Sequence, residues 1–229
     1  MPVPMSYRWP ALCLVVGSCL LLYGCASSVS IRDTGALTAG GTLVREFSPK
    51  IALRLDAARN SGDTSNAGDF YDDGDIELGD LTIAVTDQLG AEFDIDSVAL
   101  SAEFNVVDHD VVGLRLHAGL RRTRLDLELT DALDNSYRYK GTSYGPGGGI
   151  ELLLPLNDHF ALMVRGGAHF YVGGDTGRET SWGGGLLIRP HPQLELLAGW
   201  FESEYHNTEN RSNIEIQSSG PLVNLRLRF

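Results

Sequence analysis

A strict alternation of apolar and polar side chains runs through most of this chain and limits the folds open to it. Near its start, for example, Ile51 and Leu53 alternate with Arg54 and Asp56. Because successive side chains of a β-strand point to opposite faces, a period of two predicts strands whose two faces differ in polarity. The pattern recurs in eight segments, at about 51–57, 98–106, 112–120, 150–156, 160–172, 182–188, 194–200 and 223–229. An all-β protein is therefore expected.

Short and long connections alternate between these segments. The short connections centre on 108–110, 157–159 and 190–192. The longer, polar connections cover about 61–95, 130–136, 174–180 and 206–213. This alternation is typical of an antiparallel up-and-down transmembrane β-barrel with tight periplasmic turns and longer extracellular loops, and eight strands satisfy the even count of such barrels. Both chain ends are then expected on the short-turn side, and Leu81–Val85 is expected to pair locally inside the first long loop.

The second face of the strands carries opposite charges at facing positions. Centring the three short turns predicts three such pairs: Glu103–Arg115, Glu151–Arg165 and Arg189–Glu195. A facing pair of opposite charges stabilises a strand pair by roughly 0.2–1 kcal/mol. With Arg54, Asp56, Arg226 and Arg228, these residues are expected to form a charged ring inside the barrel; exposed cross-strand pairs of a soluble sheet are the alternative.

Glycine is frequent on this charged face, which suits a narrow barrel in which large side chains must alternate with small ones. The glycines concerned are Gly113, Gly119, Gly147, Gly149, Gly167, Gly183, Gly185 and Gly199. The last strand changes phase, since its early apolar residues Ile214 and Ile216 are even-numbered and its later ones are odd-numbered. Gly220-Pro221 between the two sets predicts a bulge.

The N-terminal segment has the pattern of an export signal. Residues 1–24 carry a single charge followed by a short apolar run, which is typical of a signal peptide and too short for a membrane-spanning helix. The run ends at Leu22-Tyr23-Gly24-Cys25, which resembles the lipobox of bacterial lipoproteins and implies acylation of Cys25; cleavage a few residues later by ordinary signal peptidase is the alternative. Residues 25–47 are rich in Ser, Thr, Gly and Ala and are expected to be a periplasmic tether.

Residues 48–229 resemble the eight-stranded outer-membrane barrels of the OmpA, OmpX and opacity-type porin group. The terminal alternation of Leu225, Leu227 and Phe229 is similar to the C-terminal insertion signal that the outer-membrane assembly machinery recognises in that group. The resemblance implies the cell outer membrane of a Gram-negative bacterium, with its lipids and lipopolysaccharide as surroundings.

The sequence gives little support for a catalytic site, a metal site or nucleic-acid binding. The chain has 30 acidic against 18 basic residues, a formal charge of −12, which argues against a nucleic-acid partner. Inward-facing His117 and His169 could form an acid–base pair with Glu151, but structural roles inside a polar interior are favoured. Asp69, Asp73, Asp75 and Asp80 resemble part of a calcium loop, although Tyr71 stands where a ligand belongs, and a solvated acidic loop is favoured.

A non-enzymatic envelope protein without a cofactor is therefore expected. Its barrel would be the anchor, and its acidic loops would serve envelope integrity, adhesion or interaction with an extracellular partner. Two alternatives stay open: an outer-membrane enzyme that modifies lipid A or phospholipid, and a lipocalin-like soluble lipoprotein that binds an apolar ligand.

Overall fold

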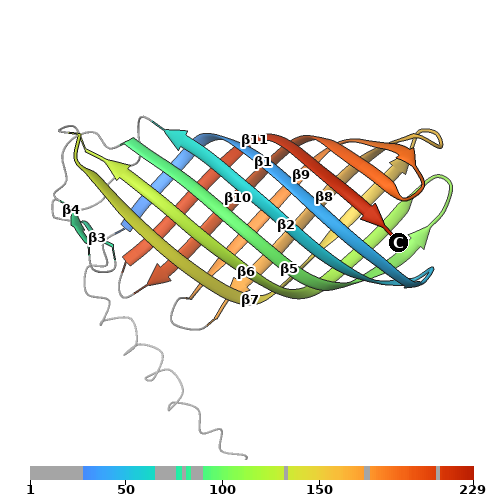
Figure 1. The fold of residues 1–229 in the computed structure, drawn as a ribbon, viewed down its shortest axis with the longest axis horizontal. Helices are drawn as coiled ribbons and strands as arrows, with labels where there is room; N and C mark the ends of the chain where they lie inside the picture. Colours follow the sequence, from blue (N-terminus) through green and yellow to red (C-terminus); the bar gives the residue numbers. More distant parts are fainter. Residues whose placement is uncertain are drawn as a thin grey trace, which may run out of the picture.

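The computed structural model describes residues 28–64, 76–78, 81–83, 90–131, 134–172, 176–209 and 212–229. No helix that is long and apolar enough to cross a membrane occurs in this part of the chain. Nine strands close into one barrel (Figure 1): β1 (Ser28–Ser48), β2 (Ile51–Thr64), β5 (Gly90–Asp108), β6 (Gly113–Thr130), β7 (Ser136–Pro155), β8 (Phe160–Tyr171), β9 (Thr176–His191), β10 (Leu194–Glu209) and β11 (Ser212–Arg228).

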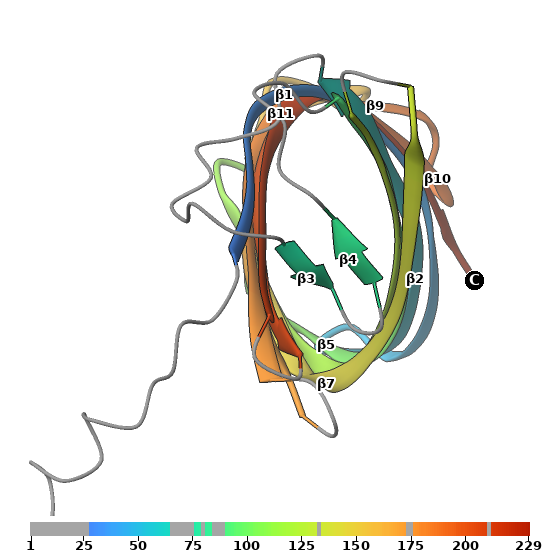
Figure 2. The same cartoon turned by 90° about the vertical axis from the view of Figure 1, so that its left-hand side faces the viewer.

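The barrel has nine strands rather than the expected eight, because the segment expected to be a tether is a strand from Ser28 onward. β1 lies between β2 and β11, antiparallel to the first and parallel to the second. When an odd number of strands runs alternately up and down, closure brings the first and last strands side by side in the same direction. The sheet is therefore mixed rather than strictly antiparallel, and Figure 2 shows its ribbons as a closed ring.

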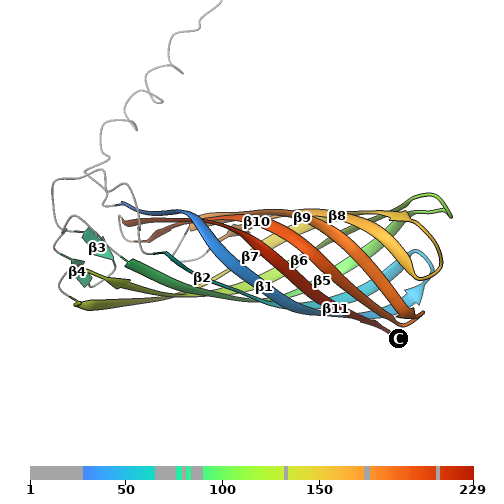
Figure 3. The same cartoon turned by 90° about the horizontal axis from the view of Figure 1, so that it is seen from above.

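The odd strand number also separates the two ends of the barrel chain. Ser28 lies across from Asn213 near the connection of β10 and β11, whereas Val44 lies across from Arg228 at the short-turn end. Figure 3 shows the C-terminus at the end opposite the small hairpin of β3 (Ile76–Leu78) and β4 (Leu81–Ile83). The expectation that both ends lie on the short-turn side is wrong.

The strands extend far into the connections that were expected to be loops. β10 reaches Glu209 and β11 begins at Ser212, so most of the loop expected at 206–213 is paired sheet. Only the connection between β2 and β5, residues 65–89, is long. Within it β3 and β4 pair with each other, which confirms a local strand pair at Leu81; Figures 1 and 2 show this hairpin at the long-loop end.

Inward and outward residues alternate without a break along the last strand. Ile214, Ile216, Leu222 and Arg226 are all buried, and Pro221 and Gly220 are paired in continuous register with β10. The predicted bulge at Gly220-Pro221 is therefore absent. The apparent change of phase arises because the barrel interior is apolar near the long loops and polar near the short turns.

Candidate functional site

The outer wall of the barrel is covered by exposed apolar side chains. On β6, Leu120 has 68% of its surface exposed, and on β5, Leu100 has 53%. Every strand of the barrel contributes exposed apolar residues to this apolar band: Leu37, Leu43, Leu53, Leu55, Val98, Leu100, Phe104, Leu116, Leu120, Ile150, Leu152, Leu154, Leu162, Val164, Phe170, Trp182, Leu186, Trp200, Val223, Leu225 and Leu227. A soluble monomer rarely exposes a continuous apolar surface larger than a few hundred Å².

Beyond the apolar band, toward the long loops, the outer wall becomes charged. On β6, Leu120 is followed outward by Arg122, Arg124 and Asp126. Arg138 donates two hydrogen bonds to Asp126, at 2.7 and 2.8 Å, and Lys140 lies 3.2 Å away. These hydrogen bonds lower the pKa of Asp126 to about 2, so this partly exposed carboxylate stays ionised at physiological pH.

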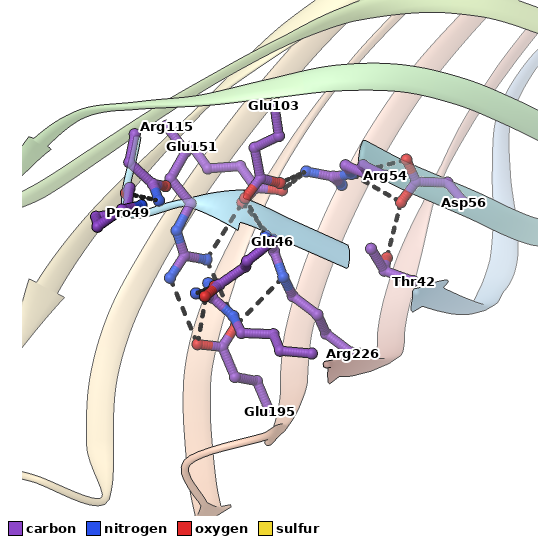
Figure 4. A network of polar contacts seen from close by, with 12 residues as sticks. Thr42, Glu46, Pro49, Arg54, Asp56, Glu103, Arg115, Glu151, Glu195 and Arg226 are labelled. Carbon is purple, nitrogen blue, oxygen red and sulfur yellow. Dashed lines mark hydrogen bonds and ion pairs between the residues drawn. The ribbon is translucent and has the colours of Figure 1, made fainter. Parts of the chain in front are cut away.

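A network of arginines and carboxylates fills the short-turn half of the interior (Figure 4). At its centre Glu103 and Glu151 lie between Arg54 of β2 and Arg226 of β11. Arg54 donates to Glu151 at 2.5 Å and to Glu103 at 3.3 Å, while Arg226 bonds to Glu103 and donates to Glu151 at 3.0 Å. The two carboxylates have only 1% of their side-chain surface exposed. The network therefore crosses the barrel and joins strands that are not neighbours.

The remaining arginines of this network surround the carboxylate of Glu195. Arg115 lies 3.4 Å from its carboxylate, Arg189 lies 3.3 Å away and Arg228 lies 3.5 Å away. Arg54 also holds Asp56 at 2.7 Å, and Asp56 accepts a hydrogen bond from Thr42 of β1. Burying a charge is costly unless it is paired and hydrogen-bonded, and here several partners surround each carboxylate.

The three pairs expected from the hairpin turns have different outcomes. Arg189 and Glu195 are bonded, at 3.3 Å. Glu151 faces Arg165 as expected, but no ion pair joins them. Glu103 faces His117 rather than Arg115, because an irregularity between Asn105 and Val107 shifts the register of this hairpin; Arg115 instead faces Asn105.

A cavity of about 150 Å³ lies above the charged network. Along β6 the interior positions pass from Arg115 in the network, through His117, Gly119 and Arg121 at the cavity, to the buried Leu125. His169 of β8 lies over its facing residue Gly147, where an added Cβ would come within 1.9 Å of the histidine Nδ1. Both inward-facing histidines thus occupy space that glycines leave free on the neighbouring strand.

Apolar and aromatic side chains fill the interior on the long-loop side of the cavity. They include Phe93, Ile95, Leu125, Leu127, Leu129, Tyr139, Tyr171, Tyr205, Ile214 and Ile216. The Tyr171 hydroxyl donates to Glu179 at 2.5 Å, and Arg121 forms an ion pair with Glu179 at 2.8 Å. Buried side chains thus occupy the interior on both sides of the cavity. The sequence did not predict the Arg121–Glu179 pair. Both residues lie on the polar face of their strands, but outside the limits expected for those strands, 112–120 and 182–188.

Several expected site residues lie elsewhere. Leu225, Leu227 and Phe229 face outward at the short-turn end, 43%, 40% and 65% exposed. Cys25 and the acidic candidates Asp69, Asp73, Asp75 and Asp80 lie outside the described residues. Among the residues that the structure describes, no cluster of His, Cys, Asp and Glu is arranged to hold a metal ion. No protein-family model matches the sequence, and no curated protein is significantly similar to it.

Proposed function

We propose that this chain is a closed outer-membrane β-barrel of a Gram-negative bacterium. The apolar band carries this proposal. On β5 it runs from Val98 to Val106, nine residues, close to the roughly 9–11 that a tilted strand needs to cross a bilayer. Barrel closure leaves no unpaired sheet edge facing hydrocarbon. Arg122 and Arg124 follow the band where lipid headgroups would begin.

We infer further that the barrel is an anchor rather than a pore or an enzyme. The charged network and the apolar filling occupy the interior on both sides of the cavity, which argues against a continuous aqueous channel through the described structure. His117 and His169 point into the interior, away from the wall that lipid would contact. An outward apolar surface also favours this proposal over a lipocalin-like barrel, which needs its apolar face inside. The surface beyond the band would then serve envelope integrity or adhesion.

An arginine scan along β7 tests the membrane-spanning part of the proposal. Ile150, 46% exposed, lies in the band, and Thr142 faces outward beyond it on the same strand. We expect Ile150→Arg to lower the unfolding free energy in lipid vesicles by about 2–4 kcal/mol, and Thr142→Arg by about 0–1 kcal/mol, because the cost depends on depth. Urea titration of the refolded proteins measures both. Equal effects at the two positions, or release of the wild type from membranes by alkaline carbonate, would refute a spanning barrel.

Replacing the long connection tests the anchor function. Thr64 faces Ala91 across β2 and β5. Asn-Gly in place of residues 65–89 therefore gives, together with Gly90, a three-residue hairpin loop that can join the two strands without moving them. We expect this variant to insert and to keep its heat-modifiable migration on detergent gels, but not to restore detergent resistance or adhesion to cells that lack the protein. Full complementation by the shortened protein would mean that the connection is not the functional surface.

A further inference from the structure

Arg165 of β8 lies inside the barrel without a partner of its own. It faces Glu151, but that carboxylate is already engaged by Arg54 at 2.5 Å, by Arg226 at 3.0 Å and by Arg115 at 3.6 Å. Within the described part of the chain Arg165 makes neither an ion pair nor a hydrogen bond. Its side chain instead lines the internal cavity, together with Arg54 and Arg121.

The interior has more positive than negative charge. Seven arginines point inward among the described side chains: Arg54, Arg115, Arg121, Arg165, Arg189, Arg226 and Arg228. Six carboxylates lie within ion-pair distance of these arginines: Glu46, Asp56, Glu103, Glu151, Glu179 and Glu195. All the arginines except Arg165 have at least one ion pair within 4 Å. A guanidinium inside a protein without a counter-charge is unfavourable, so the interior lacks at least one negative charge.

Residues that line the cavity also contain buried polar atoms that have no hydrogen-bond partner. They are the Thr38 and Ser101 hydroxyls, the Asn60 side-chain oxygen, Arg121 Nε and His169 Nδ1. The Arg165 fork is free to donate. The carboxylates on the same wall do not compete for Arg165, because Asp56 and Glu151 are bound to Arg54 and Glu179 is bound to Arg121.

We propose that this cavity is a binding site for one small oxyanion of the phosphate or sulfate type, held chiefly by Arg165. Such an anion supplies the missing charge and several acceptor oxygens, and the planar guanidinium matches it through two parallel hydrogen bonds. The cavity of about 150 Å³ is ten or more times the roughly 10–15 Å³ that a single water requires. The anion would complete the interior and fix β8 relative to β2 and β6. The site goes beyond the proposed anchor function and does not depend on it.

Equilibrium dialysis with radiolabelled inorganic phosphate tests the site directly. The full chain is refolded in non-ionic detergent with phosphate present throughout, and a parallel arm uses labelled sulfate. We expect about one anion per chain, competed by the other oxyanion, and loss of binding in Arg165→Gln. Arg178→Gln is the matched control, since it removes the same charge from an exposed position on the outer wall of β9.

Stability gives a second readout that does not require the variant to bind. Phosphate should raise the wild-type unfolding midpoint by about 3–5 °C for each tenfold increase above saturation. Arg165→Gln should lose this slope and should unfold at a higher temperature than the wild type when only chloride is present, because it no longer buries an unpaired charge. Phosphate also stabilises proteins through exclusion from their surface, and the Arg178→Gln control sets that background.

Two results would overturn the proposal. Absence of saturable phosphate or sulfate binding by the wild type would mean that water alone fills the cavity. Equal binding by Arg165→Gln would mean that an oxyanion sits elsewhere on the protein. If Arg165→Gln does not fold, the binding stoichiometry of the wild type still shows whether an oxyanion binds. Arg165→Lys, which keeps the charge but loses the fork, then shows whether Arg165 holds it, because binding should become weaker.

Discussion

At the scale of single residues, the barrel interior is governed by which carboxylate each arginine reaches. Strand register places Arg165 opposite Glu151, yet Glu151 turns to Arg54 and Arg226 from distant strands. A side chain on the inner wall of a narrow barrel can reach across the lumen as easily as along the sheet. Facing position is therefore a poor guide to pairing here. On the outer wall, ion pairs join neighbouring strands: Asp126 lies 3.2 Å from its facing residue Lys140 and also accepts hydrogen bonds from Arg138, its diagonal neighbour.

Substitution of Glu151 tests how much the charged network contributes to the unfolding free energy. Glu151→Gln keeps the shape of the side chain but leaves Arg54, Arg226 and Arg115 without their shared counter-charge. We expect a loss of about 3–5 kcal/mol in unfolding free energy, the usual cost of breaking a buried ion pair. Glu204→Gln removes a carboxylate from an exposed pair with Arg178, and we expect about 0–1 kcal/mol there. Urea unfolding in detergent compares the two, and similar values would show that the network contributes little.

At the scale of elements, β1 determines how the barrel closes. Near its middle, the successive inward residues are small: Ala36, Thr38 and Gly40. The two faces of β1 therefore differ little in polarity. Because this contrast is weak, the alternation of polarity did not predict a strand here. In the sheet β1 is paired along most of its length on both sides, and Thr42 joins the charged network through Asp56.

Cross-linking tests the parallel closure of β1 against β11. Ala39 faces Val223 on the outer wall, and both side chains are accessible. In a background with Cys25→Ala, we expect the double variant Ala39→Cys/Val223→Cys to be joined rapidly by a short thiol-reactive cross-linker, giving a shift on denaturing gels. Ala39→Cys/Leu227→Cys, displaced by four residues, should react far more slowly. An eight-stranded barrel in which β2 pairs directly with β11 would reverse or abolish this difference.

At the scale of the whole molecule, the odd strand number gives the two chain ends different surroundings. β1 begins at the end where the long connection lies, and β11 finishes at the end with the short turns. Since Cys25 precedes Ser28 by three Cα–Cα steps, Cys25 can lie no more than about 11 Å from the start of β1. If Cys25 is acylated, its acyl chains would therefore enter the leaflet on the long-connection side.

Epitope tags on the two ends test this arrangement in intact cells. A tag inserted between Ala26 and Ser28 should be cleaved by external protease on the same side as one in the connection 65–89. A tag after Phe229 should be protected until the outer membrane is permeabilised. Protection of both terminal tags would place both ends on one side, which an up-and-down barrel of nine strands does not allow.

The sequence alone determined the all-β class, the outward and inward faces of most strands and the inward position of the charges, because a period of two depends only on local backbone geometry. It also predicted the Arg189–Glu195 contact and the facing position of Glu151 and Arg165, since a tight turn sets the register next to it. Only the tertiary structure decided the ninth strand, the mixed closure, the separation of the chain ends and the isolation of Arg165. These depend on which residues meet across the lumen, and a two-residue period carries no information about contacts between distant strands.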